Sequence, residues 1–171
     1  DDVTIPEYLK MIEFKTAVLV GAAMKMGAII AEASEHDQMA IYEFGKNLGI
    51  AFQLQDDYLD AFGDPKTFGK QVGGDIIENK KTFLYINALK LSNTEDSLQL
   101  QHLFSISPAN PEEKIEIAKQ IFIDSGATKA TKEAIHTYTQ KAFGVLDSLN
   151  ISEDKKFLLK QFGEQLMNRK I

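Results

Sequence analysis

The stretch FQLQDDYLDAFGD, residues 52 to 64, places three aspartates within an otherwise apolar segment of the chain. At about 100° per residue of an α-helix, Asp56, Asp57 and Asp60 share one face about 100° wide with Gln53. An ionised carboxylate is seldom buried, because the loss of its water shell is costly unless a cation pairs with it. The pattern therefore predicts a helix whose acidic face needs a cation.

A divalent metal ion is the best candidate for that cation. Mg²⁺ is held in proteins by one or two carboxylates, keeps several waters and takes further oxygens from substrate phosphates. Mn²⁺ suits the same oxygen ligands. A bare acidic motif also occurs at solvated helix ends, so a plain surface role stays open for the motif taken alone. The apolar neighbours and the segment that follows favour a metal site at Asp56, Asp57 and Asp60.

That following segment, GDPKTFGKQVGGD at residues 63 to 75, contains four glycines and a proline, which predict a loop. Lys70 lies within the segment and Lys80 follows it. A lysine delivers a point charge to a phosphate group, and glycines let the backbone approach a ligand closely. The segment does not fit the standard phosphate-binding loop, because it has one residue too many and follows a helix rather than a strand.

An upstream helix carries two further candidates. Between residues 7 and 33 apolar side chains cover almost every direction, which predicts a buried central helix with Lys15 and Thr16 in its middle. A lone lysine can extend its stem to the surface, and a threonine in a helix commonly bonds its own backbone. Combined with the acidic face and the lysine-bearing loop, Lys15 is interpreted as a second phosphate ligand.

The remaining pattern predicts an all-α protein. Thr4 and Pro6 are typical of a helix start, and Asp37 is expected to cap a second buried helix over residues 38–62. Strand-like alternation is lacking, so we expect two buried helices wrapped by amphipathic ones. The amphipathic helices are expected at residues 81–91, 95–104, 112–124, 128–149 and 152–169.

Composition limits the function classes. The 171 residues carry a net charge of −6 and 25 acidic against 19 basic residues, which argues against nucleic-acid binding. Cysteine is absent, so disulfides and thiolate metal sites are excluded. The longest apolar run is far shorter than a transmembrane segment. We expect a single soluble, cytoplasmic domain spanning residues 1–171.

These motifs together resemble the trans-isoprenyl diphosphate synthases, or polyprenyl synthetases. YLKMIEFKTAVL is similar to the Lys-Thr helix of that family. LGIAFQLQDDYLDAFGD is similar to its second aspartate-rich motif, and FGKQVGGDIIENKKTFL to the lysine-bearing segment that follows. The resemblance covers essentially the whole chain as the C-terminal half of the family, and implies part of the isoprenoid synthase helical bundle.

The resemblance implies specific roles. Asp56 and Asp57 would bind Mg²⁺ that bridges to the diphosphate of an allylic substrate, with Asp60 supporting the site. Other residues would act on the substrates directly: Lys15, Lys70 and Lys80 on the same diphosphate, Thr16 and Gln53 beside the reacting carbon, and Phe52 at the isopentenyl diphosphate site. Gly49 would leave room for the isoprenoid tail. The implied enzyme is a homodimeric prenyltransferase of the farnesyl or geranylgeranyl type.

Two features of the family are missing from the chain: the first aspartate-rich motif, and the arginine-bearing segments that bind isopentenyl diphosphate. We therefore expect a fragment that lacks the N-terminal half and does not catalyse the condensation alone. Two alternatives stay open, a non-catalytic subunit of a heteromeric prenyl synthase and a class I terpene cyclase. The acidic motif followed by the lysine loop favours the prenyltransferase over both.

Overall fold

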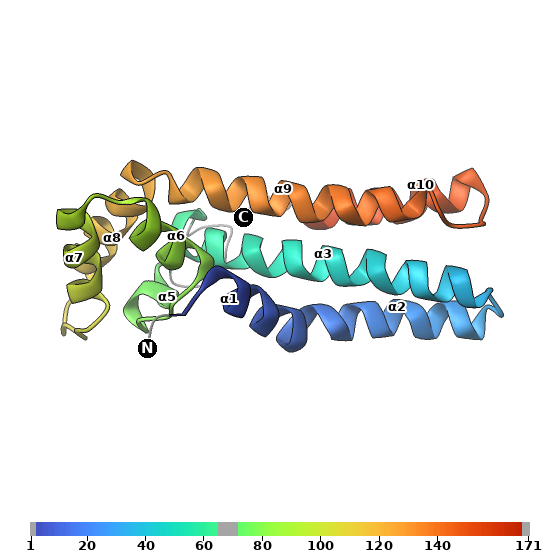
Figure 1. Cartoon of the computed structure of the whole chain (residues 1–171), viewed down its shortest axis with the longest axis horizontal. Helices are drawn as coiled ribbons and strands as arrows, with labels where there is room; N and C mark the ends of the chain where they lie inside the picture. Colours follow the sequence, from blue (N-terminus) through green and yellow to red (C-terminus); the bar gives the residue numbers. More distant parts are fainter. Residues whose placement is uncertain (1–2, 65–71, 169–171) are drawn as a thin grey trace. The chain divides into compact units, whose positions relative to one another are not determined.

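Every regular element among the described residues, 3–64 and 72–168, is a helix in this computed structural model (Figure 1). The all-α prediction is confirmed, and most predicted helices lie within a few residues of their observed bounds. The elements in chain order are α1 (Ile5–Ile12), the π-helix η1 (Glu13–Ala17), α2 (Val18–Ile30), α3 (Glu35–Phe62), α5 (Gly74–Ile77), α6 (Phe83–Leu91), α7 (Thr94–Leu103), α8 (Glu112–Asp124), α9 (Ala127–Leu146) and α10 (Glu153–Met167).

The start of α1 follows the predicted pattern. The backbone N–H of Thr4 donates to Glu7 Oε2 at 2.9 Å, and the N–H of Glu7 donates to Thr4 Oγ1 at 3.4 Å. This reciprocal arrangement is a capping box, which satisfies N–H groups that have no partner within the helix. Thr4 is thus the expected cap, with Pro6 in the first turn.

The predicted cap of the next helix is wrong. Helix α3 begins at Glu35, and Ser34 rather than Asp37 caps it, because Ser34 Oγ accepts the N–H of Asp37 at 3.1 Å. Asp37 lies in the first turn and is buried. Its carboxylate accepts the Ser34 hydroxyl at 2.8 Å and the backbone N–H of Asn150 at 2.8 Å, so it joins two segments of the chain.

The contacts divide the chain into two compact units. The first unit comprises residues 1–8, 54–133 and 170–171, and the second comprises residues 9–53 and 134–169. The long helix α3 contributes residues to both. The prediction of one domain over residues 1–171 stays a prediction.

The second unit is built from long helices that lie side by side, α2, the first part of α3, α9 and α10 (Figure 1). Phe44 and Leu48 of α3 are completely buried at its centre, against Ala142 and Leu146 of α9. Met24 of α2 packs on the same cluster. Burial of several such side chains, each contributing about 1.5–3 kcal/mol, holds this unit together.

The first unit has α6 at its centre. Six consecutive residues of α6, from Phe83 to Ala88, are buried, so this short helix is covered on all sides. Helices α7 and α8 both pack on it. The ring of Phe104 lies 4.3 Å from that of Tyr85 and 6.4 Å from that of Phe122, which links α6 to α8 through aromatic contacts.

The prediction of a buried helix between residues 7 and 33 is wrong for α2. Gly21 is the only residue of α2 that is buried, whereas Leu19 is 71% exposed and Ile30 84% exposed. Part of the apolar surface of α2 is therefore left exposed, because the neighbouring helices of the described chain cover only some of it. No helix in the described part of the chain is both long and apolar enough to span a membrane.

Candidate functional site

The acidic end of α3 is helical over Asp56, Asp57 and Asp60, as the spacing predicted. Asp57 is 7% exposed, and the other two aspartates are half-buried. Burial, and after it the nearby carboxylates of Asp75 and Asp60, raise the pKa of Asp57 to about 8, while Lys80 acts in the opposite direction. Burial likewise raises the pKa of Asp60. Both shifts show that the surroundings of this face disfavour the charged form of these two carboxyls.

Tyr8 contacts the most buried of these acids. Its ring is buried in α1 and tilted against Phe83, and its hydroxyl donates a hydrogen bond to Asp57 Oδ2. A donor on one carboxylate oxygen fixes the orientation of that carboxylate. Sequence analysis missed Tyr8, because a separation of 49 residues leaves no local signal.

Asp75 is a fourth acidic residue of the site that sequence analysis did not assign. It lies in the first turn of α5, where its backbone N–H donates to Asp60 Oδ2 at 2.9 Å. The N–H of Gly73 donates to the backbone carbonyl of Asp60 at 2.6 Å. Gly73 has a φ of +85°, a conformation that residues with a side chain rarely adopt. The pair of glycines before Asp75 was the available sequence signal for this close approach.

Lys80 is placed on the acidic site by two ion pairs. Its Nζ lies 2.8 Å from Asp75 Oδ1 and 2.8 Å from Glu78 Oε2. These hydrogen bonds raise the pKa of Lys80 above its ordinary value. The predicted contact of Lys80 with a diphosphate stays a prediction, although the lysine is exposed and stands beside the carboxylates. Lys70 lies outside the described residues.

The carboxylates of this site suit a magnesium ion better than a metal that is coordinated by protein side chains alone. Within residues 3–64 and 72–168, no three His, Cys, Asp or Glu side chains are gathered tightly enough to hold a metal by themselves. Mg²⁺ needs only one or two carboxylates when waters and phosphate oxygens complete its shell. Half-buried Asp56 and Asp60 beside buried Asp57 fit that requirement.

The second unit holds the remaining predicted residues. Lys15 and Thr16 lie in the π-helix η1, where Lys15 is exposed and Thr16 is half-buried. The Thr16 hydroxyl donates to Gln53 Oε1 at 3.1 Å, so the structure brings these two residues together. Phe52 is half-buried in α3. Because π-turns occur often at functional sites, the location of Lys15 and Thr16 in one supports their assignment.

The predicted role of Gly49 is wrong. A Cβ at this position would lie 2.7 Å from the Cα of Ala17 and 3.0 Å from its Cβ. The space that glycine leaves is therefore filled by the backbone of η1, and it is not available to an isoprenoid tail. Gly49 serves the close packing of η1 on α3.

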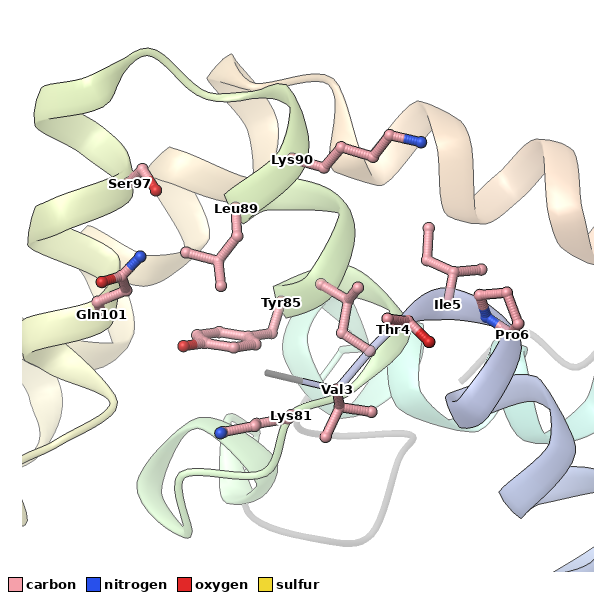
Figure 2. Close-up of a pocket in the computed structure, with 11 residues that line it drawn as sticks. Val3, Thr4, Ile5, Pro6, Lys81, Tyr85, Leu89, Lys90, Ser97 and Gln101 are labelled. Carbon is pink, nitrogen blue, oxygen red and sulfur yellow. The ribbon is translucent and has the colours of Figure 1, made fainter. Parts of the chain in front are cut away.

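A cavity of about 460 Å³ lies in the first unit, and none of its lining residues is a site residue predicted from the sequence (Figure 2). Val3 and Ile5, before and at the start of α1, form one wall, and Leu89 of α6 forms another. Lys81 and Lys90 are its charged lining residues. Lys81 follows Lys80 directly in the chain.

Comparison with known proteins identifies the family. The family model of the polyprenyl synthetases matches residues 1–122. The geranylfarnesyl diphosphate synthase of Aeropyrum pernix is 34% identical over 169 residues, which are 98% of this chain and 52% of that enzyme. The short chain isoprenyl diphosphate synthase of Methanothermobacter thermautotrophicus is 36% identical over 92% of this chain and 47% of its own length.

Solved structures agree. A crystal structure of a geranylgeranyl pyrophosphate synthase is 51% identical, with a TM-score of 0.93 over 100% of this chain and 53% of that one. The geranylgeranyl pyrophosphate synthase of Corynebacterium glutamicum, solved with isoprenyl diphosphate and magnesium, is 27% identical with a TM-score of 0.88, over 99% of this chain and 48% of its own. The chain spans about half the length of the relatives it matches. It has the all-helical isoprenoid synthase fold over that half, and it belongs to the polyprenyl synthetase family.

Proposed function

We propose that this chain is part of a prenyltransferase that condenses isopentenyl diphosphate with an allylic diphosphate. The observation that carries the proposal is the gathering of Asp57, Asp60 and Asp75 in the first unit, with raised pKa values at Asp57 and Asp60. Such a site is stabilised by a multivalent cation. The crystal structure of the Corynebacterium relative contains magnesium and isoprenyl diphosphate together, which supports the same ligands here.

In this proposal Asp56 and Asp57 hold Mg²⁺ and Asp60 supports the site, as the family resemblance implies. The metal would neutralise the charge that develops on a departing diphosphate. Asp75 is an addition from the structure, since its N–H fixes one oxygen of Asp60 and its carboxylate holds Lys80. Tyr8 orients Asp57 through its hydroxyl.

The reaction begins with cleavage of the allylic C–O bond, which leaves an allylic cation and free diphosphate. The double bond of isopentenyl diphosphate then forms the new C–C bond, and a proton is lost to restore a double bond. Lys15, Lys70 and Lys80 are proposed to bind the diphosphate, and the oxygens of Thr16 and Gln53 to stabilise the developing positive charge. Phe52 is proposed to shape the isopentenyl diphosphate site.

The test is Mg²⁺-dependent binding of inorganic pyrophosphate to the 171-residue chain, measured by calorimetry. We expect binding with MgCl₂ and much weaker binding without it. Asp57→Asn should abolish the metal-dependent part, whereas Glu95→Gln, which neutralises an exposed carboxylate on α7, should leave it unchanged. Pyrophosphate binding that is equally strong without Mg²⁺ and in Asp57→Asn would contradict the proposal and favour a non-catalytic subunit. The absence of any binding would do the same.

Condensation itself belongs to a longer protein in this proposal. Because the chain spans about half of its relatives, we expect no prenyl product when it is mixed alone with isopentenyl and allylic diphosphates. Radiolabelled isopentenyl diphosphate extracted into an organic phase after acid treatment would reveal any product. Detectable product from the pure chain would overturn the expectation that this chain is inactive by itself.

A further inference from the structure

Lys114 of α8 is the least exposed charged side chain among the described residues, at 2%. Its ammonium group donates to Asn79 Oδ1 at 2.5 Å, to the carbonyl of Ile106 at 3.0 Å and to the carbonyl of Ile77 at 3.5 Å. None of these acceptors carries a charge. Burial lowers the pKa of Lys114, as expected for an ammonium that has lost water without gaining a carboxylate.

Two of the three partners of Lys114, Ile77 and Asn79, lie at the end of one short segment, residues 73–80, which we call the carboxylate arm. Ile77 is the last residue of α5, and Asn79 follows it with a φ of +57°. The Asn79 side chain also donates to the carbonyl of Ile106 at 3.3 Å. Lys114 therefore contacts the carbonyl of Ile77 at the C-terminal end of α5 and holds the side chain of Asn79, the residue with the left-handed conformation.

The other end of the carboxylate arm is fixed by Asp60. The N–H groups of Gly73 and Asp75 both donate to Asp60, one to its carbonyl and one to its carboxylate. Between the two anchors the arm closes on itself, because the N–H of Lys80 donates to the carbonyl of Asp75 at 2.9 Å. Hydrogen bonds thus connect the arm at one end to Lys114 and at the other to Asp60.

We propose that Lys114 is a positioning residue of the acidic site, which holds the carboxylate arm so that Asp75 and Lys80 stay against Asp60. This inference rests on the proposed function, because it assigns the site to a metal-bound diphosphate. Lys114 does not touch the ligand. It acts through Asn79 and the turn that precedes Lys80, in the manner of the outer contacts that orient metal ligands.

The experiment compares three variants of the 171-residue chain: Lys114→Met, Lys114→Arg and Ile121→Val. Methionine keeps the apolar stem and removes the ammonium, and arginine keeps charged donors. Ile121→Val shortens a buried side chain on the same helix and controls for general loosening of α8. Each is measured by calorimetry for pyrophosphate binding at fixed MgCl₂, and by its unfolding temperature.

We expect Lys114→Met to weaken pyrophosphate binding about tenfold, in the range found for contacts that orient metal ligands. Lys114→Arg should recover part of the affinity, and Ile121→Val should unfold at lower temperature with its affinity unchanged. Equal affinity in Lys114→Met and the parent would overturn the inference while leaving the proposed function intact. The inference would also be overturned if the loss of pyrophosphate affinity in all three variants were proportional to the fall in their unfolding temperature. Failure of the parent chain to bind pyrophosphate would instead overturn the proposed function.

Discussion

Two aspartates on α3 are equally buried yet have opposite electrostatic surroundings. Asp37 and Asp57 are each 7% exposed. The N–H of Asn150 and the hydroxyl of Ser34 hold the pKa of Asp37 below its ordinary value. Asp57 is surrounded by further carboxylates, and its pKa is raised to about 8. Burial alone therefore does not decide the state of a carboxylate: the surroundings of Asp37 favour its charged form, whereas those of Asp57 favour its protonated form.

The largest expected effect is that of Asp57→Asn. The raised pKa means that Asp57 must bind a proton in the fold at pH 7, which an amide does not need, so the free energy of unfolding at pH 7 should rise by about 2 kcal/mol. Mg²⁺-dependent pyrophosphate binding should be lost in the same variant. Urea denaturation and calorimetry measure the two effects. A destabilised variant would show that Asp57 is a structural acid like Asp37.

The corresponding substitution at the other buried aspartate is Asp37→Ala. It leaves the N–H of Asn150 without its acceptor and removes the partner of Ser34, so the unfolding temperature should fall by about 5 °C. Pyrophosphate binding by the folded variant should be unaffected. Loss of pyrophosphate binding at a temperature where the variant is folded would contradict the distinction between Asp37 as a structural acid and Asp57 as a ligand-binding acid.

The pH dependence of stability should separate the two acids. A carboxylate with a raised pKa in the fold binds a proton that the unfolded chain has already released, so stability falls as pH rises from about 4 to about 8. Asp57 follows this rule, and Asp60 adds to it in the same direction. Asp37 has a lowered pKa, so its contribution is present above about pH 4 and is lost as pH falls further.

Thermal unfolding of the parent and Asp57→Asn between pH 5 and pH 8 measures this difference. The gap between their unfolding temperatures should widen with rising pH, and saturating MgCl₂ with pyrophosphate should narrow it. A gap that is constant over the range would mean that Asp57 does not titrate between these values.

The smallest expected effect is that of Tyr8→Phe. The variant keeps the ring against Phe83 and removes the donor to Asp57 Oδ2, which should cost about 1 kcal/mol of stability at most. Because the hydroxyl orients the carboxylate, Mg²⁺-dependent pyrophosphate affinity should also fall severalfold. An unchanged affinity would restrict Tyr8 to a packing role.

Sequence reasoning predicted the helices and the acidic face well, because both depend on local spacing. The positions of Asp56, Asp57 and Asp60 follow directly from the helical period. Asp75 and Tyr8 reach the site through contacts at 15 and 49 residues' separation, and no periodic pattern encodes such contacts. The misassigned cap at Asp37 has the same origin, since its carboxylate is committed to Asn150, 113 residues away.

The failure at Gly49 is of another kind. Gly49 was expected to leave room for an isoprenoid tail, but a glycine on a helix permits either a ligand or another backbone to approach. The choice depends on which neighbour is present, and here it is Ala17. The residue type at one position therefore could not distinguish a binding surface from a close contact between two helices.

The π-helix η1 changes how the first helices must be counted. Buried residues occur there at Tyr8, Ile12, Ala17 and Gly21, with steps of four, five and four. In a regular α-helix a step of five turns about 140° to another side, but in a π-turn it brings the residues back toward the same side. The segment thus contains one residue more than a regular α-helix needs for the same turn. Lys15 and Thr16 lie in this wider turn. A helical wheel drawn through this segment with a single period therefore mixes residues of two faces. Deletion of one residue between positions 13 and 17 would restore the regular α-helical period and would shift the side chains of Lys15 and Thr16.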